Sequence, residues 1–89
     1  MQQGELDAME KRIGVIAVLV EDPRAVPQVN DVLSRFGEII MGRLGLPYRD
    51  RGVGIISLIV EGTNDSVGAL SGQLGMISGV RTKSLLLTK

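Results

Sequence analysis

The segment VIAVLVE (residues 15–21) recurs as IISLIVE (residues 55–61). Both segments are rich in β-branched residues and too short for a helix, so each predicts a buried strand. After each strand, apolar residues return at spacings of 3, 4 and 3, which marks one face of a helix. The two sets are Val26, Val29, Leu33 and Phe36 in the first half, and Val67, Leu70, Leu74 and Ile77 in the second. The two halves therefore repeat one strand–helix unit.

Turn-forming residues set the expected ends of the helices. Asp22 is placed to cap the first helix, and Pro27 would disturb its opening turn, so a regular helix is expected from Val26 onward. Gly37 and Gly79 are predicted to end the two helices, because glycine adopts a positive φ without strain.

Each half ends in one more strand, which we expect over residues 39–46 and 80–88, with a polar connection over 47–52. The order βαβ, βαβ predicts an α+β, ferredoxin-like βαββαβ fold. This fold has a four-stranded antiparallel sheet with both helices on one face. We expect one domain over residues 11–89, preceded by a flexible acidic segment over 1–10.

Composition excludes several classes of function. The 89 residues include no Cys and no His, which argues against disulfides, zinc fingers, haem or iron–sulfur ligation and thiol or imidazole catalysis. Ten basic residues balance ten acidic ones, and only two residues are aromatic, so nucleic-acid binding is not expected. No metal or cofactor is predicted, and no nucleophile has a base partner, so we predict a protein that is not an enzyme.

No stretch of the sequence predicts a membrane span or a secretory signal. The longest apolar run is far shorter than the roughly 20 residues that span a bilayer. The acidic N-terminus lacks the basic start of a signal peptide. We therefore predict a cytoplasmic protein.

The two repeated strands are apolar on both faces. In the first strand Val15, Ala17 and Leu19 alternate with equally apolar neighbours, although two helices can cover only one face of the sheet. An exposed apolar face of several hundred Å² is unusual for a monomer. We therefore predict a homo-oligomer, a dimer or tetramer, formed sheet to sheet or through an edge strand. The predicted interface residues are Val15, Ile16, Val18, Ile56, Leu58, Gly68, Gly72 and Gly75.

The three glycines of that set form a stripe on the second helix, opposite its apolar face. Each glycine costs about 0.8–1 kcal/mol relative to alanine inside a helix. The stripe is explained either by a short, irregular helix or by the close approach of a partner chain or ligand.

Three further groups of charged or glycine-rich residues are candidate sites. Glu21 and Glu61 occupy equivalent strand ends, but without a third ligand they do not predict a metal site. The cationic cluster Arg43, Arg49 and Arg51 is typical of a solvated loop, or else it meets an acidic ligand. The segment GVG (residues 52–54) precedes a strand instead of a helix, so it is not a phosphate loop.

The segment GALSGQLGMISGVR (residues 68–81) closely resembles the small ACT-like proteins described as regulators of the iron-only hydrogenase system. VED (20–22), QVN (28–30) and RLGLP (43–47) match this family in order and spacing. The resemblance covers residues 11 to 88. It implies a βαββαβ domain, similar to amino-acid-sensing ACT domains and to the ligand-binding half of nickel-responsive repressors. Such domains assemble as dimers or tetramers and bind small effectors at subunit interfaces.

Two departures limit what the resemblance implies. The chain lacks the His and Cys used in nickel sensing, and it has no helix-turn-helix motif or basic arm for DNA. We therefore expect a non-catalytic regulatory domain that binds an amino acid or another carboxylate and acts through a hydrogenase-related partner protein. The predicted effector-binding residues, near the first strand–helix turn, are Asp22, Asn30, Gly37 and Glu38.

Two alternatives stay open. In the first alternative, the chain is an interaction or assembly module for hydrogenase maturation and binds its partner protein without a small ligand. An enzyme of the dimeric α+β barrel type is disfavoured because no catalytic constellation is present.

Overall fold

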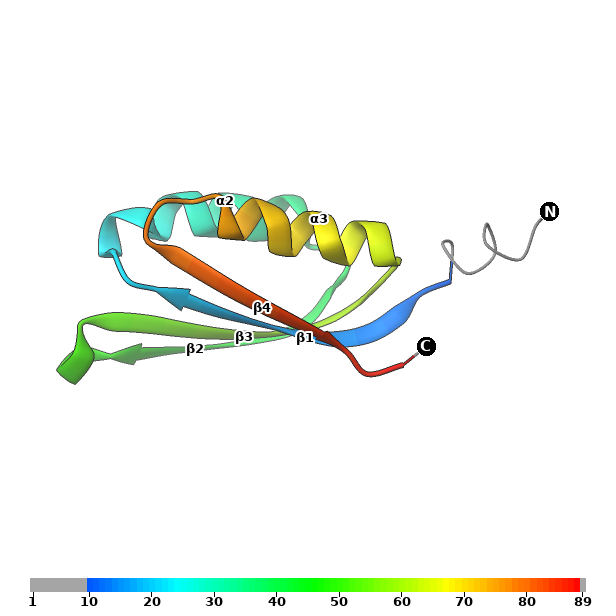
Figure 1. The fold of residues 1–89 in the computed structure, drawn as a ribbon, viewed down its shortest axis with the longest axis horizontal. Coiled ribbons are helices and arrows are strands. Elements are labelled where there is room, and N and C mark those ends of the chain that lie inside the picture. The colour runs from blue at the N-terminus through cyan, green and yellow to red at the C-terminus, as the bar shows by residue number, and fades with distance from the viewer. Residues whose placement is uncertain (1–9, 89) are drawn as a thin grey trace.

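The computed structural model describes residues 10–88, so all of the predicted acidic segment except Glu10 lies outside the described residues. Four strands and two α-helices follow one another in the predicted order (Figure 1). Two short 3₁₀ turns, η1 and η2, join them. The elements are β1 (Arg12–Val20), η1 (Pro23–Ala25), α2 (Val26–Arg35), β2 (Ile40–Tyr48), η2 (Arg49–Arg51), β3 (Val53–Gly62), α3 (Asn64–Gly75) and β4 (Val80–Leu86).

The strands form one antiparallel sheet in the order β2-β3-β1-β4. The two repeated strands, β1 and β3, pair in its centre, and α2 and α3 lie side by side on one face (Figure 1). This arrangement confirms the predicted ferredoxin-like βαββαβ fold.

The first helix begins as predicted. The Asp22 carboxylate accepts a hydrogen bond from the Arg24 amide at 2.9 Å, which caps the 3₁₀ turn η1. Regular α-helix starts only at Val26, with Pro27 in its first turn, where a missing amide hydrogen has no cost.

The end of that helix differs from the prediction. Gly37 does not take a positive φ; among residues 10–88 only Gly52 (φ 67°) and Gly79 (φ 82°) do. The last turn tightens instead, and the Gly37 amide donates to the Ser34 carbonyl at 3.3 Å. This 3₁₀-type closure satisfies the terminal carbonyls without a left-handed residue.

The second strand is longer than predicted. β2 includes Pro47 and runs to Tyr48, opposite Gly54 and Val53 of β3, so residues 47 and 48 belong to the sheet and not to a polar connection. β2 is an edge strand, where a residue without an amide hydrogen is tolerated. The β2–β3 hairpin therefore projects as a long ribbon closed by η2.

The core lies between the sheet and the helices. Its residues are all apolar: Ile16, Val18, Val20, Ala25, Val29, Val32, Leu33, Leu58, Val60, Val67, Leu70, Leu74 and Val80. Three predicted interface residues belong to this set, Ile16, Val18 and Leu58, which are at most 1% exposed. They were misplaced in the prediction because alternation along β1 and β3 points them at the helices and away from the other face of the sheet.

Candidate functional site

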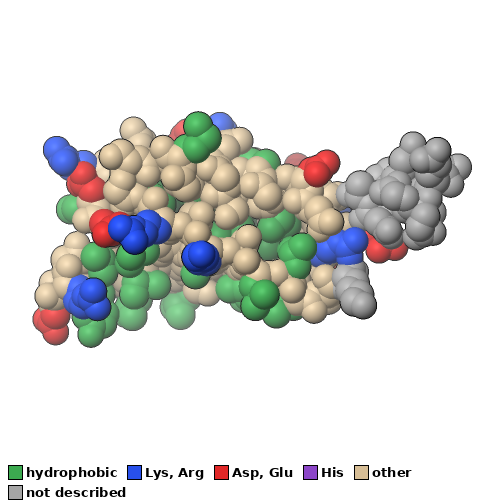
Figure 2. Space-filling view, viewed as in Figure 1, with side chains coloured by type: hydrophobic (Ala, Val, Ile, Leu, Met, Phe, Trp, Pro, Cys, Tyr) green, Lys and Arg blue, Asp and Glu red, His purple; other side chains and the backbone are tan. Residues whose placement is uncertain are grey.

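The face of the sheet that carries no helix is largely apolar. We call it the open face, and its residues are Ile13, Val15, Ala17 and Leu19 of β1, Ile55, Ser57 and Ile59 of β3, Leu44, Leu46 and Tyr48 of β2, and Leu85 of β4. Leu44 is 71% exposed and Leu85 63%. Figure 2 shows hydrophobic side chains gathered along the lower, sheet side of the molecule. The prediction that β1 and β3 present a second apolar face is confirmed.

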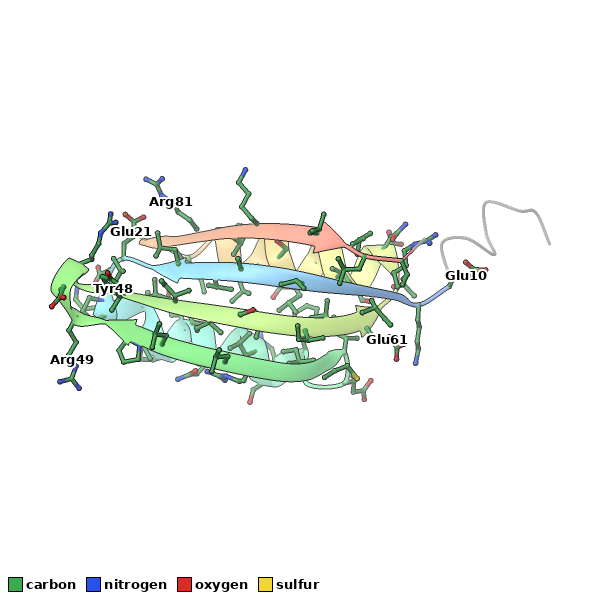
Figure 3. The ribbon with its side chains drawn as sticks, turned by 90° about the horizontal axis from the view of Figure 1, so that it is seen from below. Glu10, Glu21, Tyr48, Arg49, Glu61 and Arg81 are labelled. Atoms are coloured by element: carbon green, nitrogen blue, oxygen red, sulfur yellow. The ribbon has the colours of Figure 1, made fainter. Side chains whose placement is uncertain are left out.

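The open face has small residues at its centre and charged residues at its rim. Ala17 and Ser57, both small, lie opposite one another on the two central strands. Charged side chains stand at the ends and at the β4 edge (Figure 3), where Arg81 pairs with Glu21 at 2.9 Å. An apolar surface that is surrounded by a polar rim is typical of a protein–protein interface.

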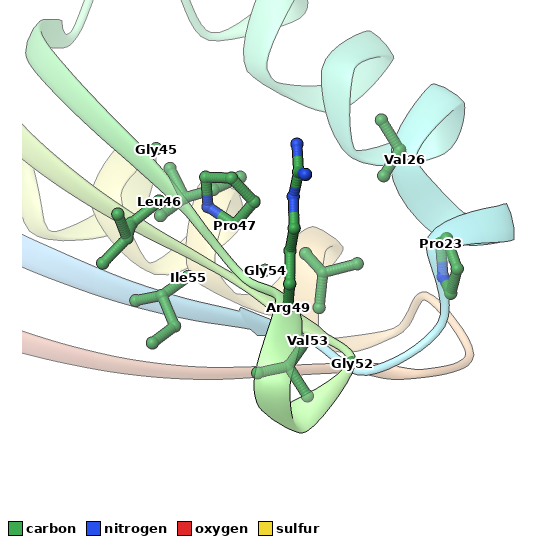
Figure 4. Close-up of a pocket in the computed structure, with 12 residues that line it drawn as sticks. Pro23, Val26, Gly45, Leu46, Pro47, Arg49, Gly52, Val53, Gly54 and Ile55 are labelled. Atoms are coloured by element: carbon green, nitrogen blue, oxygen red, sulfur yellow. The ribbon is translucent and has the colours of Figure 1, made fainter.

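A second feature lies on the helix side of the sheet, where the β2–β3 hairpin projects past the start of α2. A groove of about 600 Å³, which we call the hairpin groove, separates the hairpin from η1 and α2 (Figure 4). Its lining is Val20, Pro23, Val26, Gly45, Leu46, Pro47, Arg49, Gly52, Val53, Gly54, Ile55 and Ile56.

Glycine forms much of the floor of the hairpin groove. Gly45 lies opposite Ile56 and shares its face of the sheet, and a β-carbon built on Gly45 would meet nothing within 4 Å. A β-carbon on Gly54 would only touch Val20, at 3.9 Å. The groove is therefore open space above bare backbone, with apolar walls.

Arg49 is the charged residue among the described residues that line the hairpin groove. Its side chain extends from η2 into the space between Pro47 and Val26 (Figure 4). Within residues 10–88 Arg49 enters no ion pair or hydrogen bond through its guanidinium group. None of the described residues that line the groove is acidic.

The turn beside the groove has its own charge pair. Two Arg24 nitrogens hold both carboxylate oxygens of Asp22, the shortest contact being 2.8 Å. The Arg24 side chain and amide lower the pKa of Asp22 below its ordinary value, and Asp22 raises the pKa of Arg24. The Asp22 carboxylate is thus engaged as a cap and an ion-pair partner.

The four predicted effector-binding residues are not brought together. Asp22 precedes η1, Asn30 lies exposed in the middle of α2, and Gly37 and Glu38 follow its far end. The ten residues of α2 separate the two ends by about 15 Å. None of the four lines the hairpin groove.

The glycines of α3 divide into two kinds. A β-carbon at Gly75 would lie 3.2 Å from the Thr82 hydroxyl, so Gly75 lets α3 approach β4. Gly68 and Gly72 are exposed, with nothing within 4 Å of a built β-carbon. The stripe is therefore partly explained by packing within the chain.

The charged residues that are candidate sites in the sequence lie apart in the structure. Glu21 and Glu61 lie at opposite ends of the sheet (Figure 3), because β1 and β3 run antiparallel. Within residues 10–88 no three His, Cys, Asp or Glu side chains gather to hold a metal. Of the cationic cluster, Arg49 lines the groove, whereas Arg43 and Arg51 do not.

A shallower hollow of about 720 Å³ lies between α2 and α3. Its charged residues, Asp31 and Arg35, pair with each other at 3.5 Å. Its charges are thus satisfied within the chain, unlike Arg49 in the hairpin groove.

No helix among the described residues is long and apolar enough to cross a membrane.

The solved structures that resemble this chain share its fold. The protein TM1266 of Thermotoga maritima, described as uncharacterized, superposes with a TM-score of 0.85 at 44% identity, over 89% of this chain and 100% of that one. The ACT domain from a GTP pyrophosphokinase of Chlorobium tepidum gives a TM-score of 0.71 at 22% identity, over 84% of this chain and 99% of that domain. At this lower identity the likeness concerns the fold alone.

A more distant structure is a nitrogen regulatory PII-like protein from Thiomonas intermedia K12, bound to ADP, AMP and bicarbonate. It has a TM-score of 0.50 and 16% identity, over 91% of this chain and 94% of that one. Among curated proteins none matches this chain.

The family model called TM1266-like matches residues 12–84, and its description reads "Iron-only hydrogenase system regulator, putative". The match extends from the first residue of β1 to within two residues of the end of β4. The 44% identity to TM1266 over the full length of that chain agrees with this match. The chain belongs to the TM1266-like family of iron-only hydrogenase system regulators, and its fold is that of an ACT domain.

Proposed function

We propose that the chain is a non-catalytic regulatory domain that works as a homo-oligomer and responds to a small effector. The open face is the single observation that carries the homo-oligomer, because a contiguous exposed apolar patch marks an interaction surface. The family of hydrogenase system regulators and the ACT-like fold support a regulatory role.

A second copy of the chain is the proposed cover. Ala17 and Ser57 are small and lie opposite one another, so larger side chains of an identical face have room to pack over them, as the inner faces of two packed sheets interdigitate. The rim carries both signs of charge, Arg81 and Lys83 along β4 and Glu61 at the end of β3, so the face is able to complement itself.

The effector part of the proposal has a separate basis. The family resemblance implies an effector bound at a subunit interface, which we expect near the first strand–helix turn, and an open groove lies beside that turn. The regulated partner is then a protein of the hydrogenase system, which the domain would contact once it is assembled.

One charge on the open face tests this account. Ala17→Glu puts a carboxylate in the centre of the proposed interface, on an exposed position where it removes nothing from the core. Ser34→Glu adds the same charge on the exposed side of α2 and is the matched control. We expect Ala17→Glu to lower the molar mass measured by light scattering to that of one chain, and Ser34→Glu to leave it unchanged. Equal masses for the two variants would reject the open face as the interface.

The alternative function is an assembly module without a small ligand. The exposed glycines Gly68 and Gly72 favour it, because they leave the outer side of α3 smooth enough for another chain to approach. Capture of a hydrogenase maturation protein by the purified domain, unchanged by added amino acids or carboxylates, would favour this alternative over the effector-binding domain.

A further inference from the structure

We propose that the hairpin groove binds a small monocarboxylic acid with an apolar body and no amino group, and that Arg49 pairs with its carboxylate. The inference rests on the proposal that this domain responds to a small effector, and it names the chemical class of that effector. It also places the site within one chain, among residues other than those predicted from the sequence.

The shape of the groove favours a small, largely apolar ligand. A volume of about 600 Å³ lies within the range of small-molecule sites. Pro23, Val26 and Pro47 supply apolar walls, and Gly45 and Gly54 leave the floor free of side chains. A flat or branched hydrocarbon group would cover this surface and remove it from water.

Arg49 defines the polar end of the ligand. Its guanidinium group has no partner within the described residues and projects into the groove between Pro47 and Val26 (Figure 4). A guanidinium binds a carboxylate through two parallel hydrogen bonds. It is the one cationic side chain among the described residues of the lining, which matches a single negative charge better than the two or more charges of a phosphate ester.

The absence of acidic side chains from the described lining argues against a free amino acid. The ammonium group of such a ligand would lose water on entering the groove without gaining a carboxylate partner. Asp22, which stands next to the lining residue Pro23, is already held by Arg24 at 2.8 Å. The groove therefore selects the acid over the corresponding amino acid.

Three probes with one hydrocarbon body test this selection by calorimetry: 3-phenylpropanoate, its neutral amide 3-phenylpropanamide, and phenylalanine. We expect saturable binding of 3-phenylpropanoate, and binding at least about tenfold weaker for the other two, as for loss of a charged hydrogen bond or burial of an unpaired charge. Equal or tighter binding of phenylalanine would overturn the proposal, and so would no binding of 3-phenylpropanoate.

Variants locate the binding. Arg49→Gln is expected to weaken the binding of 3-phenylpropanoate at least about tenfold and to leave the affinity for 3-phenylpropanamide unchanged. Its matched control is Arg51→Gln, which lies in the same turn outside the lining and should bind like the parent chain. Gly45→Val, whose side chain would enter the groove, should abolish binding of both. Unchanged affinity in Arg49→Gln would contradict the assignment even if Gly45→Val failed to fold.

The failure of this inference is distinguishable from failure of the proposed oligomer. Because one chain builds the whole groove, Ala17→Glu is expected to bind 3-phenylpropanoate with unchanged affinity after it has become monomeric. Loss of binding in that variant would show that the site needs a second copy, which contradicts the single-chain groove but not the oligomer.

Discussion

Gly79 and Asp22 lie so close that a β-carbon on Gly79 would stand 2.7 Å from the β-carbon of Asp22. Gly79 also adopts φ 82°, and its carbonyl accepts a 2.7 Å hydrogen bond from the Glu21 amide. The turn before β4 is thereby joined to the turn after β1. This contact fixes the end of the sheet at which the hairpin groove opens.

Gly79→Ala should therefore destabilise the fold. Alanine at this positive φ costs about 1–2 kcal/mol, and the steric overlap with Asp22 adds about 1–3 kcal/mol. We expect the free energy of unfolding to fall by roughly 2–5 kcal/mol, measured by urea denaturation. A stability equal to that of the parent chain would show that the two turns are not in contact.

Gly72→Ala is expected to have the opposite effect. Gly72 is an exposed position inside α3, and a β-carbon there meets nothing within 4 Å. Replacing glycine by alanine in a helix interior gains about 0.5–1 kcal/mol. A rise in the urea midpoint without a change in molar mass would confirm that Gly72 has no role in assembly. A rise accompanied by loss of assembly would indicate that a partner chain approaches there.

Neighbouring residues of β3 should respond differently to truncation. Leu58 is fully buried against the helices, whereas Ile59 is 43% exposed on the open face. The comparison is made in the Ala17→Glu variant, which we expect to be monomeric, so that losses of assembly do not enter. In this variant Leu58→Ala should lose about 2–5 kcal/mol of folding stability. Ile59→Ala should lose less than about 1.5 kcal/mol there, because its side chain is only partly buried. Similar losses for the two would contradict the division of the sheet into a core face and an open face.

The Asp22–Arg24 pair predicts a pH effect with a definite sign. Because Arg24 lowers the pKa of Asp22 in the folded chain, the pair stabilises the fold above the ordinary carboxyl pKa, and this is lost as the pH falls through the lowered value. Asp22→Asn keeps a capping side chain but removes the charge. The stability difference between the parent chain and Asp22→Asn should therefore be present at neutral pH and shrink below about pH 4.

A titration followed by NMR tests whether Arg24 is the cause of the lowered Asp22 pKa. The carboxyl carbon of Asp22 should titrate below its ordinary pKa in the parent chain and return towards it in Arg24→Ala, since the Arg24 side chain is the largest cause. Arg35→Ala, which removes a different exposed ion pair, should leave the Asp22 midpoint in place. An unshifted midpoint in the parent chain would mean that the pair does not form in solution.

The fold could be predicted from the sequence because the hydrophobic pattern and the helix-boundary residues agree. The repeated strands, the two helical stripes and the position of Pro27 all point to one topology, and α2 begins at Val26 as expected. The end of β2 was missed because Pro47 ordinarily marks a turn. Only the strand order shows that β2 is an edge, where proline is accepted.

The candidate site was less accessible to sequence reasoning. Asp22 and Glu38 are polar residues next to turns and Asn30 lies in the middle of α2, but the distances between them in space depend on the length and direction of that helix. The glycines of RLGLP and GVG were the available signal for the hairpin groove. Their significance depends on the register that sets Gly45 opposite Ile56 and Pro47 opposite Gly54, which composition and spacing do not reveal.

The molar mass of the parent chain in solution tests the central claim most directly. Light scattering at micromolar concentration should give at least twice the 9.5 kDa of one chain, because the open face is then covered by a second copy. A single species of 9.5 kDa over the same concentrations would contradict the account and leave the open face without the partner proposed for it.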